Sequence, residues 1–217
     1  MCAALNFAAA FALLFILAPA TPLVADPVER LIYVGTHLLE WRLGWMTWIA
    51  AALSLLWFYW WWRDRINGSY VPLIFAGLGL VADVTAELIL IVGGIETYAN
   101  ASPFAFALTG GVANGLYTIC GIVLTLATPL NGRERAWAAV MWAAGILLSV
   151  GALANIPLVT AASTAVLFAL FCPWCVYLAV KLRETRRGRR RRLLRPRDRA
   201  PPRRRRDRAD RRVSHAR

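Results

Sequence analysis

Six long apolar runs divide this chain, and they constrain its fold more than any other feature. They cover residues 4–25, 43–62, 71–93, 104–128, 137–156 and 160–182. Each run is close to the roughly 20 residues that a helix needs to cross the hydrocarbon core of a bilayer. Inside lipid the backbone must satisfy its own hydrogen bonds, which a helix does within one segment. We therefore expect an all-α, polytopic transmembrane bundle of about six spans in residues 1–182.

The remaining residues, 183–217, form a separate basic tail. From Lys181 onward, 19 Lys and Arg residues accompany 4 Asp and Glu residues, although the whole chain carries a net charge of only +13. A segment so rich in arginine and so poor in apolar residues is predicted to be disordered. Its arginines are expected to contact anionic lipid head groups at the cytoplasmic surface. The candidate lipid-binding residues are Arg186, Arg187, Arg189, Arg190, Arg191 and Arg192. Nucleic acid is a less favoured partner because no stacking aromatic residues lie among the arginines.

Basic residues in the short loops predict the orientation of the bundle. Arg63 and Arg65 follow the second run, Arg133 and Arg135 precede the fifth, and the loop around Glu96 has neither Lys nor Arg. Positive charge accumulates in cytoplasmic loops. With six spans, the basic loops and the tail fall on one side, so both termini are predicted to be cytoplasmic. A bacterial inner membrane is the compatible setting.

Two segments in the N-terminal part of the chain allow alternative structures. Residues 4–25 resemble the apolar region of a signal peptide or signal anchor, with LVA before Asp26, but the preceding MCAALN has no positive charge. We expect an uncleaved helix there, with cleavage as the alternative. Residues 28–41 alternate apolar and polar side chains at helical spacing, which predicts a helix in the outer interface. An N-terminal extension of the second span fits the same pattern.

Two carboxylates interrupt the third apolar run near the middle of the membrane. Asp83 and Glu87 stand four residues apart, so they share one helix face and lie about 6 Å apart along the axis. Ala76, Gly79 and Ala86 lie on the same stripe, which suits close packing against another helix. Acids within a membrane span are functional by default, here as a proton or cation relay or a polar-substrate site. A hydrogen-bonded pair that sets helix register is the structural alternative.

A complementary polar stripe lies in the fourth run. Its members recur at spacings of three and four: Gly111, Asn114, Gly115, Thr118, Gly121 and Thr125. Tyr117 flanks this stripe. If the third and fourth spans form an antiparallel hairpin, Asn114 and Thr118 are expected to reach Asp83 and Glu87. Because no basic residue lies at mid-depth, we expect at least one carboxyl to carry a proton unless water or a cation reaches it. The candidate proton or substrate site therefore comprises Asp83, Glu87, Asn114, Thr118 and Tyr117.

A CPWC motif places Cys172 and Cys175 in the sixth run. The motif resembles the CxxC of membrane thiol oxidoreductases of the vitamin K epoxide reductase kind, over this tetrapeptide alone. The resemblance implies redox chemistry in which one thiol attacks and the other resolves. However, the chain lacks a second, loop-borne cysteine pair, and the motif lies toward the cytoplasmic end, where thiols stay reduced. A metal site would need Cys120 as a third ligand, and structural or palmitoylated thiols are further alternatives.

These patterns rank three functions for an integral membrane protein. The first is a small transporter or permease-like protein with a protonatable carboxylate pair. The second is a non-enzymatic assembly or scaffold protein whose basic tail binds anionic lipid or a partner, and the third is a membrane thiol oxidoreductase. The sequence has no Walker A, GxGxxG, HExxH or GxSxG pattern, so an enzyme is the less favoured alternative and no cofactor is expected. Expected partners are the lipid bilayer and either a second copy or another membrane protein.

Overall fold

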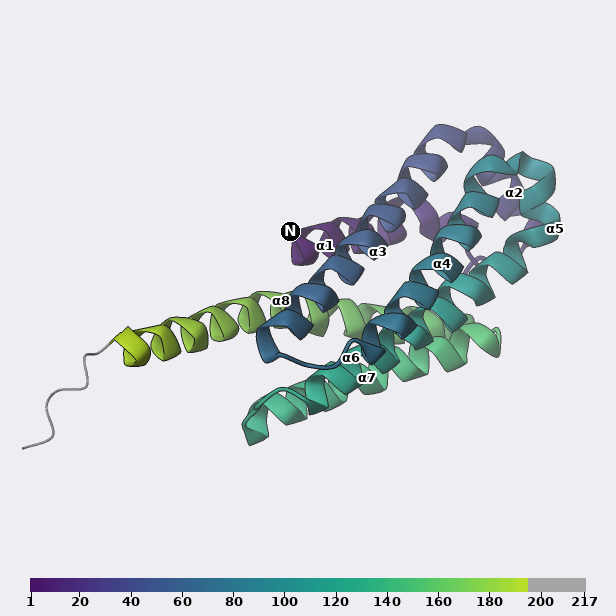
Figure 1. Ribbon diagram of the computed structural model, residues 1–217. Helices are drawn as coiled ribbons and strands as arrows, with labels where there is room; N and C mark the ends of the chain where they lie inside the picture. The colour runs from purple at the N-terminus through teal and green to yellow at the C-terminus, as the bar shows by residue number, and fades with distance from the viewer. Residues whose placement is uncertain (195–217) are drawn as a thin grey trace, which may run out of the picture. The chain divides into compact units, whose positions relative to one another are not determined.

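The computed structural model describes residues 1–194, except the side chains of residues 94 and 185–194, and its regular structure is entirely helical (Figure 1). The elements are α1 (Cys2–Ala12), η1 (Leu13–Leu17), η2 (Ala18–Ala20), α2 (Pro27–Thr36), α3 (Leu38–Ile66), α4 (Val71–Val92), α5 (Gly94–Phe106), η3 (Ala107–Ala113), α6 (Asn114–Leu126), α7 (Gly132–Leu153) and α8 (Pro157–Leu194). Two of the short elements, η1 and η3, are π-helical, and η2 is a 3₁₀ turn.

Six helical segments in the described part of the chain are long and apolar enough to cross a membrane. They are Cys2–Ala20, Leu38–Ile66, Val71–Val92, Ile95–Leu126, Gly132–Leu153 and Pro157–Glu184. The prediction of an all-α chain with six spans is therefore confirmed, and the protein is treated below as a multi-pass membrane protein. Every predicted run lies largely within one of these segments, because a sustained apolar stretch has no other low-energy backbone conformation in lipid.

The predicted loop between the third and fourth spans is instead the helix α5, which continues through η3 into α6. Polar residues such as Glu96 and Asn100 suggested a loop, but a helix that projects beyond the apolar core can carry polar side chains. Tyr98 anchors α5, because its ring is 3% exposed and its hydroxyl donates to the carbonyl of Ala20. The chain reverses at Gly93, where a Cβ would lie only 2.2 Å from Thr97 Cβ.

The amphipathic segment 28–41 contains a break between two helices. The helix α2 begins after Asp26, whose carboxylate accepts a hydrogen bond from the Val28 amide at 2.8 Å. It ends at Thr36, and α3 starts at Leu38 after a non-helical His37. Residues 27–36 therefore form a separate helix, while the rest of the segment extends the second span.

A cluster of aromatic residues holds one end of the bundle together. Trp41 is fully buried, donates its indole N–H to the Leu90 carbonyl at 3.2 Å and packs edge-on against Tyr98, with ring centroids 5.5 Å apart. Arg42 donates its Nε to the Ile91 carbonyl at 3.0 Å. These contacts use carbonyls at the C-terminal end of α4, where a helix leaves them without intrahelical partners. They fix α3, α4 and α5 to one another at this end.

A second aromatic layer joins α8 to the bundle at the opposite end. Trp174 is fully buried and contacts Trp62 of α3 and Trp137 of α7, with centroid separations of 6.4 and 5.5 Å. Phe171, one turn earlier, contacts Phe58 at 6.1 Å. Edge-on and tilted pairs of this kind stabilise a contact beyond their buried area alone.

The chain divides into two compact units, Met1–Ala179 and Val180–Arg217. The helix α8 extends to Leu194, beyond the end predicted for the sixth run. The side chains of Arg186, Arg187 and Arg189–Arg192, and all of residues 195–217, lie outside the described part. The lipid contacts of the tail therefore stay a prediction.

Candidate functional site

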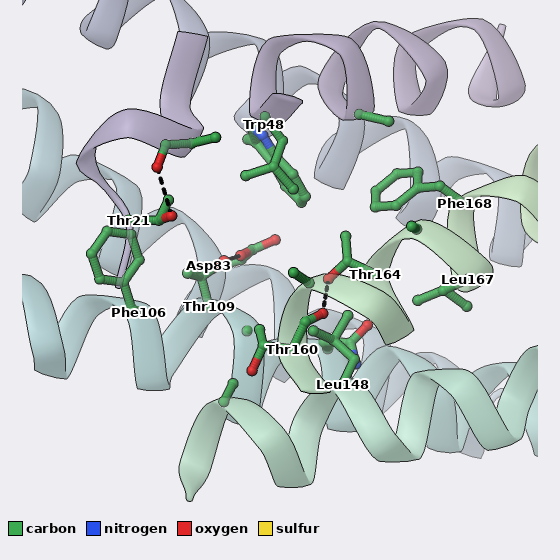
Figure 2. Close-up of a pocket in the computed structure, with 18 of the residues that line it drawn as sticks. Thr21, Trp48, Asp83, Phe106, Thr109, Leu148, Thr160, Thr164, Leu167 and Phe168 are labelled. Atoms are coloured by element: carbon green, nitrogen blue, oxygen red, sulfur yellow. Dashed lines mark hydrogen bonds between the residues drawn. The ribbon is translucent and has the colours of Figure 1, made fainter. Parts of the chain in front are cut away.

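A cavity of about 820 Å³ lies inside the first unit, between α1 and α3 on one side and η3, α6, α7 and α8 on the other (Figure 2). Its wall reaches the α1–α2 connection through Thr21 and Ala25 and the α7–α8 turn through Asn155 and Pro157. Both connections stand at the same end of the bundle, so the cavity reaches the surface there. The volume is within the range of about 300–1,000 Å³ that is usual for small-molecule sites.

Large aromatic side chains form the opposite, deep end of the cavity. Tyr59, Trp142 and Phe171 line it, and they come from α3, α7 and α8. Tyr59 is 1% exposed and donates its hydroxyl to the Tyr117 carbonyl at 3.0 Å. Beyond them lies the aromatic layer around Trp174. The cavity therefore reaches the connections at one end of the bundle and is lined by large aromatic side chains toward the other.

Asp83 is the one acidic residue among the described residues that line this cavity. Its side chain is 5% exposed, and both oxygens are hydrogen-bonded. The Thr109 hydroxyl donates to Oδ1, and the Tyr117 hydroxyl donates to Oδ2 over 3.3 Å. Figure 2 shows Asp83 and Thr109 facing the space that Trp48 and Phe168 border. A buried carboxyl with two hydroxyl donors and access to a cavity can exchange a proton or bind a polar group.

Thr109 was missed by the sequence analysis because the local helix is not α-helical. It belongs to the π-helical turn η3, where the hydrogen-bond pattern changes and side chains rotate relative to an ideal α-helix. The spacing of three and four that runs through Gly111 and Asn114 does not include position 109. The glycine pair Gly110-Gly111 within an apolar run is the only sequence signal for this turn. π-Helical turns occur frequently at functional sites.

Glu87 differs from Asp83, although the spacing put both acids on one face. Its side chain is 0% exposed, and within the described residues neither carboxyl oxygen has a hydrogen-bond partner. Burying an ionised carboxylate without a donor costs far more than burying the neutral acid. We therefore expect Glu87 to hold its proton, while Asp83 is the acid that lines the cavity.

Close packing of α4 against η3 and α6 brings the hydroxyls to Asp83. Ala76 and Ala86 on the predicted small-residue stripe are fully buried. At Gly79, a Cβ would lie 3.0 Å from a ring carbon of Tyr117 and 3.1 Å from the Ala113 carbonyl oxygen. The stripe therefore faces a neighbouring helix, as predicted, and its glycine sets how closely the two backbones approach.

Asn114 and Thr118 do not reach the carboxylates, contrary to the prediction. The Asn114 amide donates to the Gly145 carbonyl and the Ser149 hydroxyl, both at 2.8 Å. Thr118 packs at Gly145, where a Cβ would lie 2.5 Å from its hydroxyl oxygen. The reason is that α6 contacts both α4 and α7, and these two side chains lie on the α7 face. Both residues still line the cavity, together with Tyr117.

The cysteines of the CPWC motif have different surroundings. Cys172 is partly exposed and lines the cavity, whereas Cys175 is 3% exposed and lies beside Cys2. The sequence analysis missed Cys2 because its partner is 173 positions away. All four cysteines are free thiols. Within the described residues, no three His, Cys, Asp or Glu side chains are arranged to hold a metal ion, so Cys120 does not complete a site there.

Comparisons of this chain with family models, with curated proteins and with solved structures found no match. The functional argument therefore depends on the geometry of the cavity and of Asp83.

Proposed function

We propose that the protein is a small transporter or permease-like protein in which Asp83 is the protonatable centre. The observation that supports this proposal is a buried carboxyl, held by two hydroxyl donors, in the wall of a cavity that reaches one end of the bundle and has aromatic side chains toward the other. Alternating access requires a binding site of this kind between two gates. The aromatic layer around Phe171 and Trp174 would be the closed gate in this conformation.

The exchange at Asp83 balances charge without a basic residue. The ionised carboxyl can bind one proton or one cationic group of a solute, but not both at once. Thr109 and Tyr117 stabilise the ionised form by donating hydrogen bonds, which are stronger to a charged acceptor. A solute that leaves is replaced by one proton, so the site is never left as an unpaired charge in a low-dielectric interior.

Glu87 would limit the site to one negative charge. The two acids stand one helical turn apart, about 6 Å along the axis. Two ionised carboxylates at this separation repel strongly where the dielectric constant is low. Exchange at Asp83 therefore proceeds with Glu87 in its neutral form.

The orientation of the bundle would direct this exchange. Arg63, Arg65, Arg133 and Arg135 all lie at the end of the bundle opposite the open end of the cavity. By the positive-inside rule these residues belong on the cytoplasmic side. The cavity would then open outward in a bacterial inner membrane, with both termini cytoplasmic.

Proteoliposomes with an internal pH dye and an imposed pH gradient test the proposal. Solutes of different classes are added outside: alkali cations, organic cations, organic anions and neutral polar molecules. A coupled solute should collapse the gradient faster in liposomes that contain the protein than in empty ones. The variant Asp83→Asn should abolish this effect, because an amide cannot exchange a proton in this way.

The matched control is Glu96→Gln, a neutralised acid on an exposed position of α5. It should collapse the gradient at the wild-type rate. Size-exclusion chromatography and helical circular dichroism establish that both variants fold. The proposal is refuted if Asp83→Asn transports as fast as the wild type, or if no solute class collapses the gradient beyond the empty liposomes.

A further inference from the structure

We propose that the cavity binds a hydrophobic organic monocation, such as a quaternary ammonium or phosphonium ion with apolar substituents. This inference rests on the proposed function and names the class of solute that the Asp83 site takes. It depends on three features of the cavity: the sign of its buried charge, the aromatic residues around it and its opening toward lipid.

The buried charge of the cavity favours a cation. Asp83 and Arg30 are the charged side chains among the described residues that line it. Arg30 belongs to α2, at the open end, and it also interacts with Tyr98 on α5. Asp83 lies at mid-span on α4, beside Tyr117. An anion that entered this deep would meet a carboxylate and no basic side chain, whereas a monovalent cation would neutralise it.

Aromatic faces near the carboxylate suit the same ligand. Trp45 and Trp48 of α3 line the cavity with Phe106 and Phe168. Trp48 and Phe168, both labelled in Figure 2, lie edge to face with centroids 5.6 Å apart. The ring centroids of Trp45 and Phe106 lie 6.1 Å apart. Organic cations are attracted to aromatic rings by the ring quadrupole, most strongly to tryptophan. Small, strongly hydrated ions such as Na⁺ gain little from such walls.

The wall that α1 contributes is open to the bilayer. Phe7 and Leu14 line the cavity, yet their side chains are 67% and 65% exposed. In a transmembrane helix, exposed apolar side chains face lipid. A solute that partitions into the membrane can therefore reach the cavity from the lipid side, where a strongly hydrated solute would lose its water. This favours a cation with a large apolar surface.

Binding measurements with two ions of matched shape test the assignment. Tetraphenylphosphonium and tetraphenylborate have nearly the same size and apolar surface but opposite charge. Each is titrated into the full-length protein in one detergent, and binding is followed by calorimetry and by tryptophan fluorescence. The wild type should bind the phosphonium ion more tightly than the borate ion.

Variants separate the charge of the site from its apolar surface. Asp83→Asn should weaken phosphonium binding about tenfold or more and should not weaken borate binding, since only the cation loses its counter-charge. Trp48→Leu should weaken phosphonium binding by about two- to fivefold, the size of one cation–π contact. Arg30→Gln should leave phosphonium affinity unchanged or raise it. Glu96→Gln is the control for a lost acid on the surface.

Several outcomes would overturn the inference: equal or tighter binding of borate by the wild type, full phosphonium affinity in Asp83→Asn, or loss of affinity in Arg30→Gln. If Asp83→Asn does not fold, Trp48→Leu and the comparison of the two ions still decide the matter. If another solute class collapses the pH gradient while phosphonium does not bind, the solute class is wrong and the proposed function stands. If phosphonium binds through Asp83 but no solute collapses the gradient, the binding site stands and the transport function is refuted.

Discussion

Replacing Glu87 with methionine should stabilise the protein, although it removes an acidic residue from the centre of the bundle. The wild-type side chain is 0% exposed, and within the described residues neither carboxyl oxygen has a hydrogen-bond partner. A buried polar group without a partner costs about 1–3 kcal/mol. Methionine is similarly long and unbranched, so its own packing cost should stay below about 1.5 kcal/mol. We expect a net gain of about 1 kcal/mol in the free energy of unfolding.

The matched comparison is Asp83→Leu one turn away. This change leaves the hydroxyls of Thr109 and Tyr117 without their acceptor. At about 1 kcal/mol for each hydrogen bond, it should destabilise the protein by about 2 kcal/mol. The two variants should therefore differ by about 3 kcal/mol, with opposite signs. Glu96→Met, at an exposed position of α5, should change the free energy by less than about 0.5 kcal/mol.

Reversible unfolding in mixed detergent micelles, titrated with sodium dodecyl sulfate and followed by tryptophan fluorescence, measures these differences. In the unfolded state the separated helices give both acids access to water, so the comparison reports the cost of burial. The reasoning is refuted if Glu87→Met destabilises the protein as much as Asp83→Leu does. That result would mean that Glu87 has a strong partner in the folded bundle.

Three further predictions concern packing, the tail and the thiols. Gly79→Leu should destabilise the bundle by about 1–3 kcal/mol, because a Cβ at this position meets the Tyr117 ring and the Ala113 carbonyl oxygen. Gly77→Leu should not destabilise it, because nothing lies within 4 Å of a Cβ there. The same unfolding titration measures both variants. Deleting Arg186–Arg217 should remove most binding to anionic vesicles in a flotation assay, since each basic residue near the membrane surface contributes about 1 kcal/mol of binding free energy. Retained binding would exclude the tail as the lipid contact. A mild thiol oxidant should link Cys2 to Cys175, which lie beside each other, and peptide mass spectrometry would identify that link. A disulfide within the CPWC motif would instead support the thiol oxidoreductase hypothesis.

Much of the candidate site could be predicted from the sequence, but not its internal contacts. Asp83 is marked by its residue type and depth, and the small stripe around Gly79 correctly predicted a packed helix face. The sequence did not distinguish Asp83 from Glu87, because a spacing of four gives both the same face. It also assigned Asn114 to the carboxylates, although α6 turns that side chain toward α7. A polar helix face can contact either of two neighbouring helices, and the packing of all three helices decides between them. The periodicity of one helix does not predict that choice.

The sequence by itself determined the class of the protein: six apolar runs, a basic tail and two intramembrane acids. It could do so because the length of an apolar run and the need to satisfy backbone hydrogen bonds are local properties. Only the tertiary structure decided which of the two acids lines a cavity, because that depends on where helices distant in sequence leave space between them. The tertiary structure also brings the Thr109 hydroxyl to Asp83 Oδ1 through a π-helical turn. Such a turn changes the side-chain register without changing the hydrophobic pattern.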